Sequence, residues 1–425
     1  MHSPTSVISP AAGDARREAP ITALEIGMFL VLLASYALNA MDRQIFPLIA
    51  ADVRKEFGFS LADTGLLSTI FTLGMAVAGV PTGYLLARLP RKTVLQIGIA
   101  IFSLGTLLAA YSHGFADMIV YRAVTGIGEA MQLTVVIAIA ASYFARYRAT
   151  AVGAINFSFG IGAILGPLLG GHLIGVERDW RLPLIVFGVA GFAAMAIIAL
   201  TVSKRMTENV AATGGRSDQR GATTLWNRNT ALLTGMSVIG GLCIYGYLGM
   251  YPTFLREHLH YTPSDTGRVM SIFGFGVFAS IFGGWLGDRF HPKLVLSASF
   301  VGTGLLGFLM FSGPTDMVVQ SALSFAWGFV VSGVLYVNLA GYHIKAVHAS
   351  LTSRATGVFV TTLYGAGAVA GFIIGGIASR FVEIPSAAAM RAAKSGTADS
   401  KTLGAVTVVA MAGSADMIDV RTLVT

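Results

Sequence analysis

The sequence predicts an all-α membrane protein with two pseudo-symmetric six-helix bundles around a central cavity, and three observations support this. First, the 425 residues are 54% hydrophobic and only 12% charged, with a mean hydropathy of +0.71, whereas soluble domains carry about 25% charged residues. Second, the chain contains many apolar runs of bilayer-spanning length, since about 20 helical residues cover a hydrocarbon core of about 30 Å. Third, short motifs recur in the two halves at nearly constant spacing.

Eleven apolar runs reach spanning length, where two six-helix bundles require twelve. They lie at about 24–46, 62–87, 93–112, 117–144, 149–175, 182–203, 229–254, 264–287, 293–313, 316–341 and 355–381. The first run is too long for the apolar core of a secretory signal, so we expect it to remain as the first helix. After Phe381 the longest apolar run is Leu403 to Ala412, which is shorter than the 17 residues or so that a span needs. The twelfth helix is therefore atypical: either it is marginal and masked by packing, or the tail is disordered, or the reading frame diverges near this point.

The predicted organisation alternates polar and apolar segments. It comprises an N-terminal tail (1–23), a first bundle (24–203), a polar linker (204–228), helices 7 to 11 of a second bundle (229–381) and an atypical C-terminal segment (382–425). With the N-terminus inside, sixteen basic residues fall in cytoplasmic segments and six in the opposite loops. The positive-inside rule thus predicts a cytoplasmic N-terminus and linker in a bacterial inner membrane. Topology also explains the net charge of +8 without invoking nucleic acid.

Three motifs occur once in each half. Asp63-Thr-Gly65 recurs as Asp265-Thr-Gly267, Arg148-Ala-Thr150 as Arg354-Ala-Thr356, and Gly83-x-x-x-x-Arg88 as Gly284-x-x-x-x-Arg289, at offsets of 202, 206 and 201. Repeats at a nearly constant offset indicate duplicated structural units. Parallel halves of this kind place a cavity between two bundles.

The second-half loop Gly284-Trp-Leu-Gly-Asp288-Arg289-x-x-x-Lys293 resembles the cytoplasmic loop signature of the major facilitator superfamily, and the resemblance covers about residues 20 to 381. The first-half counterpart, Gly83 to Lys92, has Ala87 where the family usually has Asp, and Pro90 where it usually has Gly. The resemblance implies that this Asp helps to latch the cytoplasmic face, so we expect a weaker latch in the first half. Loop residues with expected conformational roles are Gly83, Arg88, Arg91, Gly284, Asp288 and Arg289.

A glycine-rich stretch lies in the fifth run. Gly162-x-x-x-Gly166-Pro167-x-x-Gly170-Gly171 resembles a signature of the superfamily that is often associated with antiporters and also occurs in importers. Small residues permit close helix packing, and a proline kinks the helix. Gly166 and Pro167 are therefore predicted hinge positions, although packing alone also explains each glycine.

Two ionisable residues lie inside the apolar run 117–144. Arg122 and Glu129 are seven positions apart, so they share one helix face, and Gly126 and Gly128 between them allow close approach of another helix. A charge at the centre of a spanning helix costs roughly 3 kcal/mol, so such residues usually mark a substrate or ion path. The alternative is a buried structural ion pair.

Asp42 and Arg43 form a second charged pair near the end of the first run. Together with Arg122 and Glu129, they resemble the organic-anion and sugar-acid symporter branches of the superfamily. Asp42 lies just before Pro47, and Arg122 lies near the outer start of its helix, so we expect both at a similar depth in the outer half. Arg43 and Arg122 are candidate substrate-binding residues, and Asp42 and Glu129 are candidate proton carriers. A fixed ion network between the two helices is the alternative.

The second half offers aromatic and polar groups instead of charges. The run 316–341 has no charged residue beyond Asp316, and His343, Lys345 and His348 are expected in a cytoplasmic loop. The substrate-binding candidates on this side are Tyr245, Tyr247, Trp327, Asn338 and Tyr364. For each aromatic residue, anchoring at the lipid interface is the alternative.

The sequence therefore predicts a secondary active transporter that moves a small organic anion with protons by alternating access, and not an enzyme. Its expected partners are a small-molecule substrate, protons and the lipid bilayer, and it is expected to be a monomer. No metal, cofactor or nucleotide motif is found, and Cys243 is the only cysteine, so an intrachain disulfide is excluded. The alternatives are a proton-driven efflux antiporter of drugs or metabolites, and a non-transporting membrane sensor.

Overall fold

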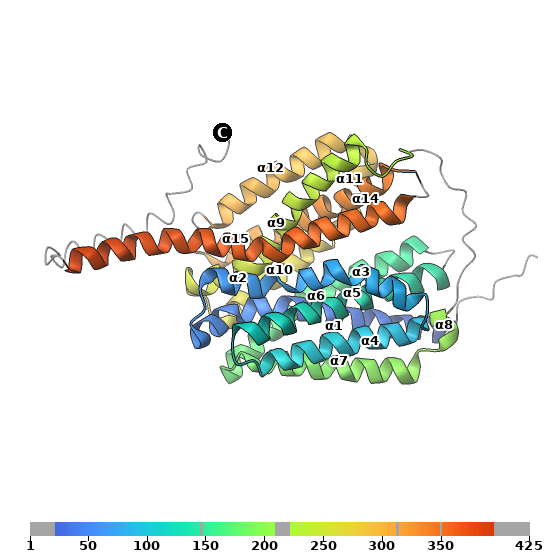
Figure 1. Cartoon of the computed structure of the whole chain (residues 1–425), viewed down its shortest axis with the longest axis horizontal. Coiled ribbons are helices and arrows are strands. Elements are labelled where there is room, and N and C mark those ends of the chain that lie inside the picture. Colours follow the sequence, from blue (N-terminus) through green and yellow to red (C-terminus); the bar gives the residue numbers. More distant parts are fainter. Residues whose placement is uncertain (1–21, 145–147, 209–221, 312–313, 349–350, 395–425) are drawn as a thin grey trace, which may run out of the picture.

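The computed structural model describes residues 22–144, 148–208, 222–311, 314–348 and 351–394, and nearly all of them are helical (Figure 1). The first half contains α1 (Ala23–Phe57), α2 (Leu61–Thr69), α3 (Phe71–Leu86), α4 (Arg91–Ala110), α5 (Phe115–Tyr143), α6 (Arg148–Glu177) and α7 (Arg181–Thr201). After the short α8 (Lys204–Glu208), the second half contains α9 (Arg228–Glu257), α10 (Pro263–Val277), α11 (Ser280–Arg289), α12 (Pro292–Phe311), α13 (Met317–Trp327), the π-helix η2 (Gly328–Tyr336), α14 (Val337–Lys345) and α15 (Thr352–Lys394).

The described residues contain ten helices that are long and apolar enough to cross a membrane, and the bent pair α10–α11 makes an eleventh span. These spans confirm the all-α membrane class and the eleven apolar runs. The pair α2–α3 forms one span, and α13, η2 and α14 together form another. The predicted C-terminal segment is helical to Lys394 as a continuation of α15. Its remainder, with the run 403–412, lies outside the described residues.

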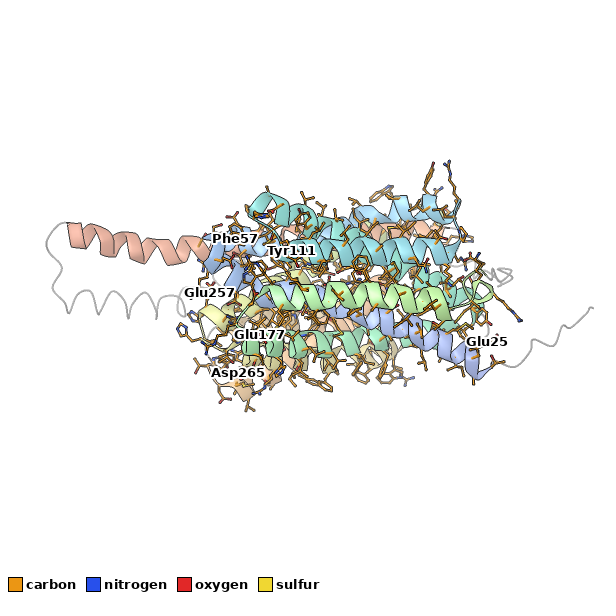
Figure 2. All side chains as sticks on the ribbon, turned by 90° about the horizontal axis from the view of Figure 1, so that it is seen from below. Glu25, Phe57, Tyr111, Glu177, Glu257 and Asp265 are labelled. Atoms are coloured by element: carbon orange, nitrogen blue, oxygen red, sulfur yellow. The ribbon has the colours of Figure 1, made fainter. Side chains whose placement is uncertain are left out.

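The two halves of the chain form two adjacent groups of helices with their axes along one direction (Figure 1). Figure 2 shows Phe57, Tyr111, Glu177, Glu257 and Asp265 at one end of the molecule and Glu25 at the other. We call the end with Glu25 and α8 the linker face, and the opposite end the far face. The second-half helices incline away from the first half toward the linker face (Figure 1).

The first helix is longer than predicted. It continues through Pro47 and ends at Phe57, where Gly58 adopts a left-handed conformation with φ 69°, instead of ending near residue 46. A proline removes a single backbone hydrogen bond, which transmembrane helices tolerate. Asp42 therefore lies about 22 Å from the far-face end of its helix, at 1.5 Å per residue, so the predicted end of this helix near residue 46 was wrong.

The repeated Asp-Thr-Gly motif has a local explanation, because it begins the second helix of each half. Ser60 and Asp63 form a capping box at the start of α2. In the second half, the Thr262 hydroxyl accepts a hydrogen bond from the Asp265 N–H at 3.1 Å, next to Pro263 at the first helical position. Both arrangements satisfy N–H groups that the first helical turn leaves unbonded.

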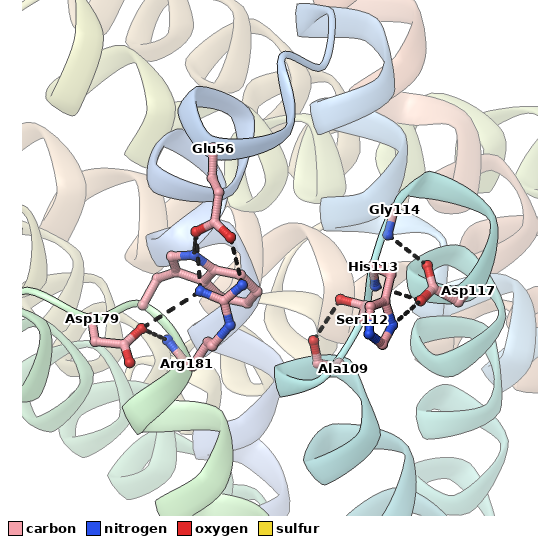
Figure 3. A network of polar contacts seen from close by, with 9 residues as sticks. Glu56, Ala109, Ser112, His113, Gly114, Asp117, Asp179 and Arg181 are labelled. Atoms are coloured by element: carbon pink, nitrogen blue, oxygen red, sulfur yellow. Dashed lines mark hydrogen bonds and ion pairs between the residues drawn. The ribbon is translucent and has the colours of Figure 1, made fainter.

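Polar contacts at the far face fix the helix ends (Figure 3). The carboxylate of Glu56 at the end of α1 accepts hydrogen bonds from Trp180 Nε1 at 2.7 Å and from Arg181 Nη1 at 3.0 Å. Asp117 accepts from the backbone N–H groups of His113 at 2.6 Å and Gly114 at 3.0 Å, so it caps α5. These charged groups lie at the ends of spans, where water can solvate them.

The predicted linker contains structure next to the first-half loop. Helix α8 docks on α4, because Glu208 accepts hydrogen bonds from the backbone N–H groups of Arg91 at 2.9 Å and Lys92 at 3.0 Å. Burial raises the pKa of Glu208, but these hydrogen bonds outweigh it and keep the pKa below its ordinary value. The loop in which Ala87 replaces the family's Asp thus receives a carboxylate from the linker.

Near the far face, helices of the two halves cross at two points where glycine lies against glycine, and we call these points the glycine crossings. Gly65 on α2 lies against Gly371 on α15, and Gly171 on α6 lies against Gly267 on α10. Gly65 and Gly267 occupy equivalent positions in the repeat, and Gly171 and Gly371 differ by 200 residues. The two crossings are therefore related by the same pseudo-symmetry as the motifs.

We expect Gly65→Ala to destabilise the protein by about 1–3 kcal/mol, because its Cβ would overlap the Gly371 carbonyl. Gly83→Ala is the matched control, since no atom lies within 4 Å of its Cβ position, and Ala is favoured over Gly in a helix by about 1 kcal/mol. Thermal unfolding in detergent should show a lower midpoint for the first variant only. Equal midpoints would contradict the assigned crossing.

Candidate functional site

Four charged side chains meet between α1 and α5, and we call them the charged cluster: Asp42, Arg43, Arg122 and Glu129. Their exposed fractions are 1%, 7%, 0% and 0%. The ion pair between Arg43 of α1 and Glu129 of α5 joins the two helices at this point. The similar depth predicted for Asp42 and Arg122 stays a prediction. Burial of this kind is maintained only where charges neutralise one another or meet a polar ligand.

Glu129 pairs with the arginine of the other helix. Arg43 Nε lies 3.1 Å from Glu129 Oε2. Arg122 shares a face of α5 with Glu129, yet no carboxylate oxygen of the described residues lies within ion-pair distance of its guanidinium. Asp42 Oδ2 accepts a hydrogen bond from Thr106 Oγ1 at 2.8 Å. Asp42 and Glu129 also interact electrostatically with each other.

The Arg122 guanidinium is buried without a hydrogen-bond acceptor. None of its three nitrogen atoms donates a hydrogen bond to a described residue. Its carbon Cζ instead lies 4.8 Å from the ring centre of Phe46 and 5.2 Å from that of Phe71. Aromatic faces stabilise a cation but accept none of its hydrogen bonds. Because a buried unpaired charged donor is costly, this fork suits a carboxylate from a ligand.

An amide network supports the cluster, and the sequence analysis missed it. Asn39 Nδ2 donates to Gln132 Oε1 at 2.8 Å, and Gln132 Nε2 donates to Ser35 Oγ at 3.1 Å. Asn39 precedes Arg43 by four positions, and Gln132 follows Glu129 by three, so helical periodicity places them on the same faces as the charges. That spacing is the signal that could have identified them.

Glycines bring α5 close to its neighbours. A Cβ on Gly126 would overlap the backbone of Phe71 on α3, and one on Gly128 would overlap Gly98 and Phe102 on α4. The close approach predicted from these two small residues is therefore present. It places the ring of Phe71 against Arg122.

Two second-half tyrosines face the charged cluster. The Tyr245 ring packs against Phe71 at 6.0 Å and against Tyr364 at 5.7 Å. The Tyr364 hydroxyl lies 3.4 Å from that of Tyr336, and Tyr245 and Tyr364 both interact electrostatically with Arg43. Tyr36 on α1, which the sequence analysis did not select, does so as well. These tyrosines form a hydroxyl-bearing wall opposite the arginines.

Two other aromatic candidates lie elsewhere in the second half. Tyr247 stacks on Trp327 with 5.0 Å between ring centres and shares a hydrogen bond of 2.9 Å with Ser324. It also stacks on Tyr251 at 4.9 Å. These contacts lie between α9 and α13, within the second half. Tyr247 and Trp327 are therefore not brought together with Arg122, and their substrate role stays a prediction.

Asn338 and His343 are buried in α14. Asn338 Nδ2 donates to the carbonyls of Gly283 at 2.8 Å and Val334 at 2.9 Å, so it satisfies backbone groups beside the π-helix η2. His343 was expected in a cytoplasmic loop, but it lies inside α14 with 0% exposure. Its Nδ1 contacts the Leu339 carbonyl at 2.8 Å, and its ring packs against Phe359. The loop expectation was wrong because the helix continues to Lys345.

The expected conformational residues have local partners. In the first-half loop, Arg88 lies over the Tyr84 ring at 3.9 Å, and Arg91 Nη1 donates to Ser142 Oγ at 3.1 Å. In the second-half loop, Asp288 pairs with Lys345 at 2.6 Å, and Arg289 is exposed at the end of α11. Gly83 and Gly284 have no atom within 4 Å of their Cβ positions, whereas Gly166 packs against Met41, and Pro167 packs against Gly267. The close packing expected for Gly166 and Pro167 is therefore present. Their role as hinges stays a prediction.

Two ion pairs join the halves at the far face, and we call them the far-face pairs. Arg256 donates to Asp52 at 2.7 and 2.9 Å, and Arg54 lies 2.6 Å from Glu257. The partners are 204 and 203 residues apart, which matches the repeat offset, so equivalent positions of α1 and α9 carry opposite charges. All four line a cavity of about 500 Å³. This cavity lies away from the enclosed charged cluster.

Metal chemistry has no geometric support in the described part of the chain, where no three His, Cys, Asp or Glu residues converge.

Known proteins are similar to this chain over most of its length. The spinster protein of Drosophila melanogaster is 27% identical over 322 residues, which cover 71% of this chain and 52% of spinster. A probable L-galactonate transporter of Escherichia coli is 25% identical, with 66% and 65% covered. The quinolone resistance protein NorA of Staphylococcus aureus is 24% identical, with 67% and 71% covered. The chain thus spans about half of the fly protein's length.

Solved structures share the fold. The crystal structure of a bacterial homolog of the human lysosomal transporter Spinster superposes with a TM-score of 0.73 at 17% identity, covering 95% of this chain and 94% of that one. The family model of the Major Facilitator Superfamily matches residues 32–372, which include both halves and the charged cluster. The chain therefore belongs to the Major Facilitator Superfamily, a family of membrane transporters.

Proposed function

We propose that this protein is a monomeric secondary active transporter that imports a small organic anion together with protons. The observation that carries the proposal is the fully buried Arg122 guanidinium, which has no acceptor among the described residues. A carboxylate would fill the missing acceptor role through two parallel hydrogen bonds. The tyrosine hydroxyls on the opposite wall would bind the rest of the substrate.

The two carboxyl groups beside Arg43 support proton coupling. Glu129 is held by Arg43 at 3.1 Å, and Asp42 interacts with it directly. Two desolvated carboxylates at close range favour sharing a proton, while nearby arginines favour ionisation. Substrate binding and protonation can therefore influence one another through the same arginines.

Alternating access is supported by the different arrangement of the two ends. At the far face, glycine crossings and the far-face pairs join the halves, while the second-half helices incline away at the linker face (Figure 1). We assign the linker face to the cytoplasm of a bacterium, because the basic residues divide sixteen to six. The structure then corresponds to an inward-facing state.

Uptake into proteoliposomes tests the proposal directly. Purified protein would be given an inwardly directed proton gradient and labelled gluconate, benzoate, muconate or an organic cation such as ethidium. We expect concentrative uptake of at least one anion and none of the cation. If no anion were taken up, and ethidium instead left the vesicles as protons entered, the importer would be rejected.

The second candidate is efflux by proton antiport. The glycine-rich sequence of α6 favours it, and one relative bears the name of a quinolone resistance protein. An antiporter would accumulate ethidium in the vesicles when protons leave them. The same assay with the gradient reversed therefore separates the two directions, and a sensor would transport in neither.

We expect the far-face pairs to stabilise the inward-facing state. Each pair is partly exposed, with fractions of 14–33%, so removing one should cost roughly 1 kcal/mol and shift the conformational ratio about five-fold. Asp52→Asn should lengthen the distance between spin labels at positions 55 and 258, measured in a chain without Cys243. The exchange Asp52→Arg with Arg256→Asp should restore it. A distance unchanged by the single substitution would contradict this role.

The assigned topology predicts which positions are labelled from outside. In a chain without Cys243, a cysteine at Lys55 on the far face should react with an impermeant maleimide in intact cells. A cysteine at Arg205 on α8 should react only after permeabilisation. Rapid labelling at 205 in intact cells would invert the topology.

A further inference from the structure

The buried charges of the spans sum to zero. Within the described residues, the charged side chains among the buried positions are Asp42, Arg43, Arg122 and Glu129, two acids and two bases. The buried histidine of the described residues is His343 in α14, and it contributes no charge as a neutral imidazole. The titratable groups of the described residues that interact with the charged cluster from other positions are Tyr36, Tyr245, Tyr336 and Tyr364. Neutral tyrosines leave the sum at zero.

Ligand loading changes this sum in a defined way. One proton on the Asp42–Glu129 pair leaves the charged cluster with one positive charge, and a bound monovalent anion at Arg122 returns it to zero. A proton alone gives +1, and an anion alone gives −1. Because an uncompensated charge in a buried site is strongly disfavoured, the two neutral forms, empty and doubly loaded, are the ones that can change face at low cost.

Divalent anions do not fit this scheme. They would require both carboxyl groups to be protonated to reach neutrality. Arg43 would then lose the carboxylate that lies 3.1 Å from it, and the Asp42 oxygen that accepts from Thr106 would belong to an uncharged acid, which accepts more weakly. The charged cluster therefore favours substrates with a single negative charge.

We propose that this protein couples one proton to one monovalent organic anion, so that each transport cycle moves no net charge. The inference rests on the proposed proton-coupled import. It adds the stoichiometry and the charge of the substrate. The proton binds one carboxylate oxygen of the Asp42–Glu129 pair on one side of the membrane and leaves it on the other. Coupling follows from the neutrality of the buried site and needs no direct contact between proton and substrate.

The test separates the proton gradient from the membrane potential. Proteoliposomes with the purified protein would contain potassium buffers with valinomycin to set the potential, and labelled gluconate would be the monovalent probe. We expect roughly ten-fold accumulation per pH unit, unchanged by an inside-negative potential of about 59 mV. A second coupled proton would make the process electrogenic and add about ten-fold at that potential, which would overturn the inference. Accumulation that ignores the pH gradient would reject proton coupling itself, and the inference with it.

Substitutions in the charged cluster should change the driving force for anion uptake. Asp42→Asn leaves the empty charged cluster with one positive charge, so anion binding alone neutralises it. Uptake should then respond to an inside-positive potential and no longer to pH. The double variant Glu129→Gln with Arg43→Gln removes a complete ion pair, so the uptake it retains, at whatever rate, should be driven by pH and independent of potential. Glu177→Gln, an exposed acid at the far face, is the matched control and should behave as wild type. Single and double variants with the same driving force would contradict the neutrality rule.

Discussion

Arg122→Ala should reduce anion uptake by at least roughly 100-fold while the protein still reaches the membrane. The side chain is 0% exposed and donates no hydrogen bond to a described residue, so its removal breaks no hydrogen bond within the described part of the fold. Each hydrogen bond to a charged partner contributes about 1.5–3 kcal/mol, so two such bonds account for that loss. Without Arg122 the charged cluster also carries a net negative charge, which repels an anion.

Arg122→Lys should not fully restore uptake, because a point charge cannot reproduce the planar fork. The measurement is initial uptake in proteoliposomes, with thermal unfolding of each variant as a folding control. Arg268→Ala is the matched substitution, since this arginine on α10 is 62% exposed and pairs with Asp265. If Arg122→Ala transported at the wild-type rate, Arg122 would have no role in anion binding.

Glu129→Gln should abolish accumulation driven by a pH gradient but retain exchange of labelled for unlabelled substrate. The amide imitates the protonated acid in shape and neutrality, yet it cannot release a proton. At zero membrane potential, accumulation should fall from roughly ten-fold per pH unit to none. Exchange needs only the loaded form to change face, so it should continue.

Asp42→Asn identifies the proton carrier. It should give the same loss if the two carboxyl groups titrate as one coupled pair, as the neutrality of the charged cluster requires. Little loss would mean that Glu129 alone carries the proton, and would contradict that neutrality. Counterflow and pH-driven uptake, measured on the same vesicles, distinguish these cases. Should both single variants and the combined variant Asp42→Asn with Glu129→Gln still accumulate substrate with the pH gradient, coupling would have to reside elsewhere, and buried His343 would be the next group to test.

The class of protein could be predicted from the sequence because its signals are local. A membrane requires long apolar helices whatever they pack against, so hydropathy alone located the eleven spans. Repeated motifs at offsets near 202 exposed the two halves, and the capping box at Asp63 and the N-cap hydrogen bond at Asp265 show why one motif recurs. Buried charges at Asp42, Arg43, Arg122 and Glu129 were conspicuous because each is costly in an apolar run.

The partners of those charges were decided by tertiary structure. Arg122 and Glu129 share one face of α5, yet Glu129 pairs with Arg43 of α1. Sequence spacing determines which side chains share a face but not which neighbouring helix presents a closer partner. The same limit explains why the sequence did not show which aromatic residues lie near the charged cluster. Tyr245 packs against Phe71 of the first half, while Tyr247, two positions later, stacks on Trp327 within its own half, because a two-residue step rotates a side chain by about 200° around the helix.

The sequence by itself determined that this chain crosses a membrane in two related halves and buries two acids and two bases. Only the tertiary structure decided that α1 continues through Pro47, that His343 is enclosed in α14, and that none of the three Arg122 nitrogens has an acceptor among the described residues. Hydropathy and periodicity act within one helix, whereas the pairing of buried charges depends on contacts between helices about 80 residues apart in the chain.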